Sequence, residues 1–127
     1  MTVPFNAAQG LILIEVHLWG PVGDRRVQLA LDTGANTTLI RPAILVAIGY
    51  DPAASPDRVQ MTSASGIEFV ARLSVDRLDA LGQQQLNFPV LAHTLPPTAT
   101  IDGLLGLDFL RGRRLTIDFR KGQITLR

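Results

Sequence analysis

The sequence contains no cysteine, and this absence excludes whole classes of fold and chemistry. Among its 127 residues there can be no disulfide framework, no thiolate metal site and no cysteine nucleophile. Charged residues make up only 18% and aromatic residues 6%, whereas a disordered tail is polar and highly charged. No apolar run reaches the roughly 18 residues that a membrane helix needs. The chain therefore fits a compact body of small aliphatic side chains, with no membrane span within it.

Length and charge narrow the possibilities further. With 127 residues, 46% of them hydrophobic, we expect one domain over residues 1–127 with a sizeable core. The net charge of +1 gives no general attraction to nucleic acid or acidic membranes. Residues 1–10 lack the basic start and apolar stretch of a signal peptide. We therefore expect a cytoplasmic protein, unless the chain is a domain of a longer exported or anchored one.

Half of the twelve basic residues lie near the C-terminal end, and we expect them to form a solvated hairpin face rather than a nucleic-acid site. They are Arg111, Arg113, Arg114, Arg120, Lys121 and Arg127.

Most of the hydrophobic pattern has a period of two residues, which is typical of strands. Residues 11–19 and 27–31 predict the first two strands, joined by a turn at 20–24 that is rich in Gly and Pro. Later strands are predicted over 67–75 and 86–90, where Pro89 indicates an edge position, and over a final hairpin at 115–126. No clear strand is predicted at the N-terminus, before residue 11.

Two short helices complete the predicted elements. Pro42 suits a first helical position and Gly49 suits the residue after the end, which predicts a helix over 42–48. A second short helix is predicted from Leu107 to Arg111, stopped by Gly112. The total of about seven strands and two short helices indicates an all-β body.

The segment from Leu29 to Ala35 carries the clearest chemical signal. An apolar strand runs directly into Asp32, and Thr33 and Gly34 follow as a small-residue turn. The strand fixes the backbone of the aspartate, the glycine permits close approach and unusual dihedral angles, and the threonine hydroxyl can lock the turn. This pattern predicts a rigidly aimed carboxylate in an apolar setting, although ordinary turns also use these residue types.

A second segment, Ile101 to Leu110, places two apolar residues before Gly106 and a short helix after it. Together, Asp32-Thr33-Gly34-Ala35 and Leu104-Leu105-Gly106 resemble the two signature motifs of the retropepsins, the single-lobe aspartic proteases of retroviruses and their bacterial relatives. The resemblance covers about residues 10–127. It implies a closed retropepsin-like acid protease barrel with one or two short helices, in which the Gly106 segment packs beneath the active-site loop.

The same resemblance assigns roles to particular residues. Asp32, Thr33 and Gly34 are the expected catalytic motif. The expected substrate-binding residues are Ala35 and the tip of a flap hairpin within Val59–Leu73: Ser63, Ala64, Ser65 and Gly66. Asn36 and Leu107 stand where retroviral members usually have an acidic residue and an Arg, so we expect their ion pair to be missing and Asp108 to offer a carboxylate instead.

One such aspartate per chain implies two chains. Peptide hydrolysis by this chemistry needs two carboxylates that share a proton, one as general base and one as general acid. The chain has one Asp-Thr-Gly, so we expect a homodimer with Asp32 from each copy, acting on a polypeptide without cofactor or metal. His17 and His93 stand alone, with no carboxylate or second histidine at ligand spacing, and are expected to be surface or strand-face residues.

Two other interpretations remain open. The chain could be a catalytically silent retropepsin-like module that dimerises or binds peptides. The intact Asp32 motif argues against this, because a carboxylate aimed into an apolar junction costs stability. A small β-barrel with no cleft chemistry would require both motifs to be accidental.

Overall fold

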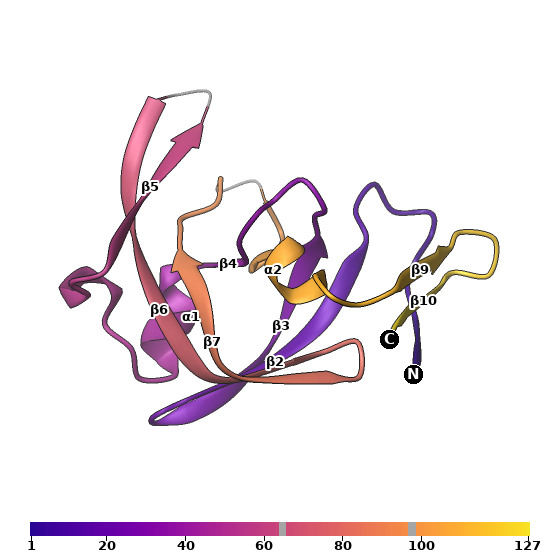
Figure 1. Cartoon of the computed structure of the whole chain (residues 1–127), viewed down its shortest axis with the longest axis horizontal. Coiled ribbons are helices and arrows are strands. Elements are labelled where there is room, and N and C mark those ends of the chain that lie inside the picture. Colours follow the sequence, from indigo (N-terminus) through magenta and orange to yellow (C-terminus); the bar gives the residue numbers. More distant parts are fainter. Residues whose placement is uncertain (64–65, 97–98) are drawn as a thin grey trace.

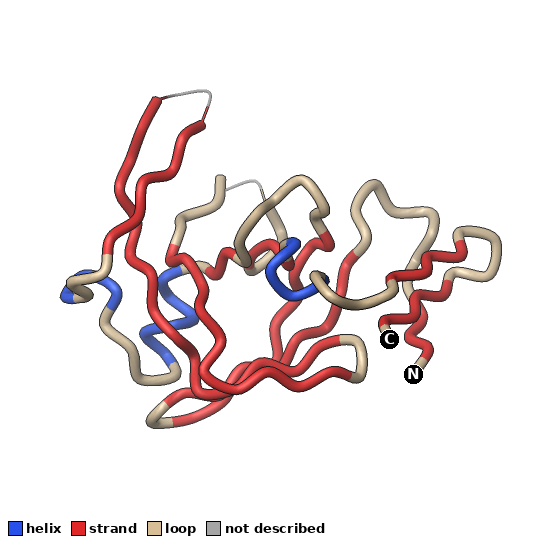
Figure 2. The backbone as a smooth tube through the Cα atoms, in the orientation of Figure 1, coloured by secondary structure: helices blue, strands red, loops and turns tan. Residues whose placement is uncertain are grey.

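The protein is an all-β structure, as predicted. A computed structural model describes residues 1–63, 66–96 and 99–127, and within them strands dominate, with two short α-helices and one 3-10 turn (Figure 2). The elements are β1 (Thr2–Pro4), β2 (Leu13–Gly20), β3 (Gly23–Leu31), β4 (Leu39–Ile40), α1 (Pro42–Ala47), η1 (Pro52–Ala54), β5 (Arg58–Ser63), β6 (Gly66–Ala80), β7 (Gln83–Ala92), β8 (Gly103–Leu105), α2 (Leu107–Leu110), β9 (Leu115–Asp118) and β10 (Gln123–Leu126).

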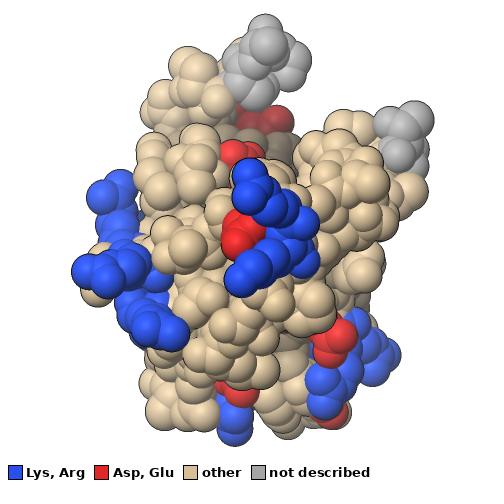
Figure 3. Space-filling view, turned by 90° about the vertical axis from the view of Figure 1, so that its right-hand side faces the viewer, with Lys and Arg blue, Asp and Glu red and all other residues tan. Residues whose placement is uncertain are grey.

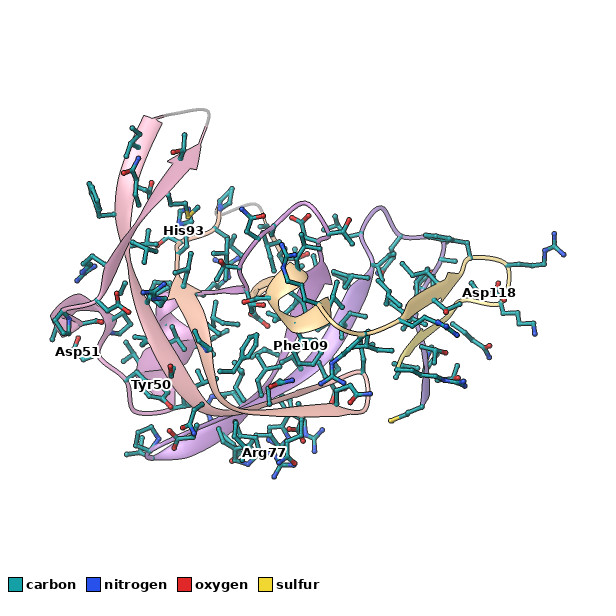
Figure 4. All side chains as sticks on the ribbon, viewed as in Figure 1. Tyr50, Asp51, Arg77, His93, Phe109 and Asp118 are labelled. Atoms are coloured by element: carbon teal, nitrogen blue, oxygen red, sulfur yellow. The ribbon has the colours of Figure 1, made fainter. Side chains whose placement is uncertain are left out.

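Six strands form a closed barrel in the order β2-β3-β8-β4-β7-β6, because β6 also pairs with β2. The predicted alternation of β2 is confirmed, since Ile14, Val16 and Leu18 point into the core with at most 1% of their surface exposed. Phe109 of α2 lies among the same core residues and meets Phe88 of β7 edge to face, with 5.9 Å between ring centres (Figure 4). The barrel thus has a continuous apolar interior.

The prediction that Pro89 marks an edge strand was wrong for the strand as a whole. β7 lies between β6 and β4. Pro89 is tolerated because β4 pairs with β7 only at Leu91 and Ala92, beyond the proline. Pro89 lies opposite Ser74 of β6. Since β4 does not extend as far as Pro89, the N–H that proline lacks is not needed for a hydrogen bond to β4.

The predicted flap hairpin is formed by β5 and the first part of β6. It projects away from the barrel (Figure 1). Its last described pair is Ser63 with Gly66, and the predicted tip residues Ala64 and Ser65 lie outside the described residues. Gly66 has a φ of +128°, a conformation that glycine adopts without strain. β5 is the terminal strand of its sheet.

Two very short strands, β4 and β8, were not predicted. β8 lies between β3, to which it is parallel, and β4, to which it is antiparallel. Gly103 permits this arrangement, because a Cβ there would lie 1.9 Å from the carbonyl oxygen of Leu39. β8 therefore brings the Leu104-Leu105-Gly106 motif next to the end of β3.

A separate three-stranded sheet holds both chain ends, in the order β1-β10-β9. The hairpin of β9 and β10 was predicted and is confirmed, whereas β1 was missed. Val3 pairs with Ile124, and the N and C termini lie close together (Figure 1). On the face of the molecule at this end, Lys and Arg side chains form several separate groups rather than one continuous patch (Figure 3).

Both predicted α-helices are present, and each is short. α1 spans six residues and α2 four. Neither of these helices could cross a membrane, and the described residues include no other candidate span.

Candidate active site

Asp32 directly follows β3, whose inner residues Leu29 and Ala30 are buried. The backbone N–H of Asp32 donates to the carbonyl oxygen of Leu105 over 3.0 Å, and the N–H of Ala35 donates to the carbonyl oxygen of Asp32 over 3.2 Å. The side chain is half-buried, and its Oδ1 accepts a 2.8 Å hydrogen bond from the N–H of Gly34. The carboxylate is thus aimed by its own turn, as predicted.

Gly34 serves a different purpose from the one predicted. Its φ lies outside the left-handed region, and no backbone comes within 4 Å of the position of a Cβ beyond its chain neighbours. The atom that a Cβ would crowd is Oδ1 of Asp32, at 3.1 Å. The absence of a side chain here therefore leaves room for the carboxylate itself.

The second motif packs beneath the Asp32 turn, as the resemblance implied. The N–H of Leu107 donates to the carbonyl oxygen of Ala35 over 2.8 Å. A Cβ on Gly106 would lie 2.8 Å from that same oxygen and 2.9 Å from the carbonyl carbon of Thr37. Gly106 is therefore required for close backbone approach.

The predicted lock by Thr33 was wrong for this structure. Thr33 is exposed, and its hydroxyl has no hydrogen bond within the described part of the chain. The threonine that locks the loop is Thr38, the one fully buried polar side chain among the described residues. Its Oγ1 donates to Oδ1 of Asp108 over 2.7 Å and accepts from the N–H of Gly106 over 3.2 Å.

Asp108 completes this arrangement with its second oxygen. Its Oδ2 accepts from the N–H of Thr38 over 2.9 Å, and its Oδ1 also accepts from the N–H of Phe109. The sequence signal for this pair is partial: Thr38 precedes two apolar residues and Asp108 follows Gly106 by two positions, but nothing in the sequence pairs the two. The expectation that Asp108 supplies a carboxylate near this motif identified one half of the pair.

An open cavity of about 530 Å³ lies between the Asp32 turn and the flap. The flap contributes β5 residues to it. The lining consists of Asp32, Gly34, Ala35, Asn36, Thr37, Leu39, Gln60, Met61, Thr62 and Leu91. Ala35 was predicted to contact substrate and lies here, whereas the flap residues identified in this lining, Gln60 to Thr62, were not predicted.

A second cavity of about 470 Å³ adjoins the first and shares Thr37, Gln60 and Leu91 with it. Its lining includes Arg72, whose guanidinium is paired with Asp57 at 2.9 Å. A third cavity, of about 510 Å³, lies beside β6 and contains none of the residues of the Asp32 turn. The first cavity is therefore the candidate cleft.

Asp32 is the only carboxylate among the described residues that line this cleft. Asp102 accepts a 2.9 Å hydrogen bond from the N–H of Gln28, and Asp108 is engaged by Thr38. No group of three His, Asp or Glu side chains within the described residues is placed to hold a metal ion. The cleft of one chain thus offers a single carboxylate for chemistry.

Comparison with known proteins agrees with this geometry. A family model described as aspartyl protease matches residues 20–109, more than half of the chain. The chain belongs to the aspartyl protease family. The matched span contains Asp32, Gly106 and the whole flap hairpin. No curated protein sequence matches significantly.

Solved structures show that this aspartyl protease family member has a retropepsin-like fold. A retropepsin-like aspartic protease from Rickettsia conorii superposes with a TM-score of 0.74 at 18% identity, covering 99% of this chain and 88% of that one. EIAV protease in complex with the inhibitor HBY-793 superposes with a TM-score of 0.61 at 20% identity, covering 86% and 92%. The predicted fold class is confirmed.

The two histidines of this family member both lie beside carboxylates that are not at ligand spacing in the sequence, and His17 lies on strand β2. Nε2 of His17 is 2.6 Å from Oδ2 of Asp24, and the ring stacks on Trp19 with 3.6 Å between centres. Nδ1 of His93 is 3.7 Å from Oε1 of Glu68. Neither histidine borders the candidate cleft.

Proposed function

We propose that the protein is a homodimeric aspartic endopeptidase in which Asp32 of each copy supplies one catalytic carboxylate. The observation that carries the proposal is a cleft with one rigidly aimed carboxylate, that of Asp32. Asp32 is the only acidic residue among the described residues that line this cleft. A two-fold axis beside the exposed Thr33 and Gly34 would bring the two Asp32 turns together.

In the proposed reaction a water molecule lies between the two carboxylates. One carboxylate takes a proton from the water as its oxygen attacks the peptide carbonyl carbon, and the other donates its proton to the carbonyl oxygen. As the tetrahedral intermediate collapses and the C–N bond breaks, the carboxyl group that took the proton from water gives it to the leaving nitrogen. The other carboxylate takes back a proton from a hydroxyl of the intermediate, so the pair again shares one proton. Two carboxylates in contact cannot both ionise comfortably, so one retains the proton that this chemistry needs.

The geometry of the flap supports a polypeptide substrate in extended form. β5 borders the cleft through Gln60, Met61 and Thr62, and it is the terminal strand of its sheet. A terminal strand presents backbone N–H and C=O groups that an extended peptide can pair with. Ser63, Ala64, Ser65 and Gly66 remain the proposed tip that closes over the peptide.

The dimer is supported by the sheet that holds both chain ends. Its outer strands, β1 and β9, have no further strand partner among the described residues. Open strand edges favour pairing with another chain. We propose that this sheet and the Asp32–Ala35 loop form the dimer interface.

The test is digestion of a peptide library by the wild-type protein and by Asp32→Asn, with and without a chelator. We expect cleavage by the wild type, unaffected by the chelator and with a bell-shaped pH profile, and essentially none by Asp32→Asn with its fold unchanged. Equal cleavage by both proteins would overturn the assignment of Asp32. A wild type that dimerises and binds peptides but cleaves none would favour the silent module.

A further inference from the structure

We propose that Thr38 and Asp108 act as positioning residues that hold the Asp32 turn in its reactive geometry. This inference rests on the proposed function, because it concerns how the same carboxylate is held. We use the name Thr38 clamp for the hydrogen bonds of Thr38 to Gly106 and Asp108.

Four consecutive residues, Leu105 to Asp108, hold the loop of residues 32–38 at successive points. The carbonyl of Leu105 accepts from the N–H of Asp32, and the N–H of Leu107 donates to the carbonyl of Ala35. These two contacts join backbone to backbone, so they form with almost any side chains. They fix the start and the middle of the loop.

The other two contacts depend on side chains, and both converge on Thr38. Gly106 donates its N–H to Oγ1 of Thr38, and Asp108 accepts from both the N–H and the hydroxyl of Thr38. The carbonyl of Thr38 in turn accepts from the N–H of Leu91 over 3.0 Å. The far end of the loop is therefore tied to the second motif and to β7 through one residue, and the hydroxyl of Thr38 makes two of these bonds.

Burial makes this connection rigid. Thr38 has 0% of its surface exposed, and a buried hydroxyl with both its donor and acceptor bonds made has no competing water. The neighbouring residue Thr37 borders both cavities of the cleft region. A loosened Thr38 clamp would therefore shift the loop that carries Asp32 while the barrel remains folded.

Substitutions at Thr38 separate positioning from stability. Thr38→Val keeps the shape of the side chain and removes the hydroxyl, and Thr38→Ser keeps the hydroxyl. The matched control is Tyr50→Phe, since the Tyr50 hydroxyl also makes one donor and one acceptor bond, both to Asp76. Tyr50 lies after α1, apart from α2 and the cleft (Figure 4).

The first measurement is steady-state kinetics of the three dimeric variants under conditions where all are folded. We expect Thr38→Val to lower kcat on the order of 10- to 100-fold, because a small displacement of a catalytic group reduces the reaction rate by about this factor. KM should change by less than about threefold. Thr38→Ser should recover most of this loss. The two limbs of the pH profile should move closer together in Thr38→Val, because a looser loop weakens the coupling between the two carboxylates.

The second measurement does not depend on activity. Amide hydrogen exchange should be at least tenfold faster at Gly34, Ala35 and Gly106 in Thr38→Val, and unchanged there in Thr38→Ser and Tyr50→Phe. A folded Thr38→Val with wild-type kcat and exchange would overturn the proposal, as would an equal loss of kcat in Tyr50→Phe. If the wild type cleaves no peptide, the proposed function fails, and the exchange data alone decide whether the Thr38 clamp holds the loop.

Discussion

At the scale of single residues, hydroxyl groups that donate and accept at once connect parts of the chain that are distant in sequence. Thr38 joins its loop to α2, and Tyr50 joins the end of α1 to β6. The phenol of Tyr50 donates to Oδ1 of Asp76 over 2.9 Å and accepts from the N–H of Asp76 over 2.8 Å. Burial, and then the hydrogen bond to the Asp76 carboxylate, raise the pKa of Tyr50 from 10.0 to about 12.

This shift predicts how stability changes at alkaline pH. Because the pKa of Tyr50 is higher in the folded state than in the unfolded state, Tyr50 contributes to the free energy of unfolding. This contribution is fully present below about pH 10 and is lost as the pH rises through about 12. Tyr50 is the only tyrosine in the sequence, so its ultraviolet absorbance reports one group. We expect the absorbance change that follows deprotonation of Tyr50 to have its midpoint near pH 12. In Asp76→Asn the midpoint should be lower than this but still above 10, because burial still raises the pKa. A midpoint near 10 in the folded wild type would contradict this reading.

At the scale of elements, the contact between the junction of β8 with α2 and the loop that follows Asp32 depends on a glycine, Gly106. In Gly106→Ala, the new Cβ would meet the carbonyl oxygen of Ala35 at 2.8 Å and the carbonyl carbon of Thr37 at 2.9 Å. Both neighbours are backbone atoms and cannot rotate away. We expect the free energy of unfolding to fall by about 1–3 kcal/mol, measured by denaturant titration. Gly23→Ala is the control, since nothing lies within 4 Å of its Cβ position, and its effect should be small.

The flap makes a second prediction at this scale. Gly66 has a φ of +128° with open space around its Cβ position, and Gly112 has a φ of +78° with the same open space. Valine at either position is strained by its backbone alone, at about 1–3 kcal/mol. We expect similar losses of stability from Gly66→Val and Gly112→Val but a larger fall in kcat/KM from Gly66→Val, because only this residue belongs to the flap. Equal effects on kcat/KM would show that the flap tip has no part in turnover.

These elements also show what the sequence could predict. The long amphipathic strands β2, β3 and β6 and the hairpin of β9 and β10 followed from their period-two patterns. β4 and β8 have two and three residues, too few for a pattern to show, and they exist because the barrel pairs them on both sides. β1 was missed for the same reason, since Val3 is its one inward apolar residue among three.

The candidate site was predictable in part for a similar reason. Asp32 and Gly106 were identified because each sits in a short local motif. Thr38 and Asp108 are 70 residues apart in sequence, and only the pairing of β8 with β3 and β4 brings them together. The cleft residues Gln60 to Thr62 were missed because the prediction placed substrate contacts at the hairpin tip, whereas the described cavity is bordered by the strand that leads to it.

At the scale of the whole molecule, the proposed homodimer predicts activity that depends on assembly. In a dilution series followed by sedimentation and by activity, specific activity should fall in step with the dimer fraction. A monomer that keeps full specific activity would contradict the shared site and would require a second carboxylate from within the chain.

Mixing provides a sharper form of the same test. If wild type and Asp32→Asn exchange subunits freely in equal amounts, about one quarter of the dimers contain two intact aspartates. Activity should then fall to about half of that expected for independent wild-type chains. Activity proportional to the wild-type fraction would show that each chain acts alone.

β8 lies between β3 and β4 in the barrel but is made long after both of them during synthesis. Asp32 leaves the ribosome long before residues 105–108 exist, and the Thr38–Asp108 bonds span 70 residues of chain. At roughly 5–20 residues per second, the missing partners arrive roughly 4–14 s later. Throughout that interval the nascent chain carries its aspartate on an unanchored loop. If the proposed function is correct, we expect the growing polypeptide to have no peptidase activity until β8 and Asp108 have been made.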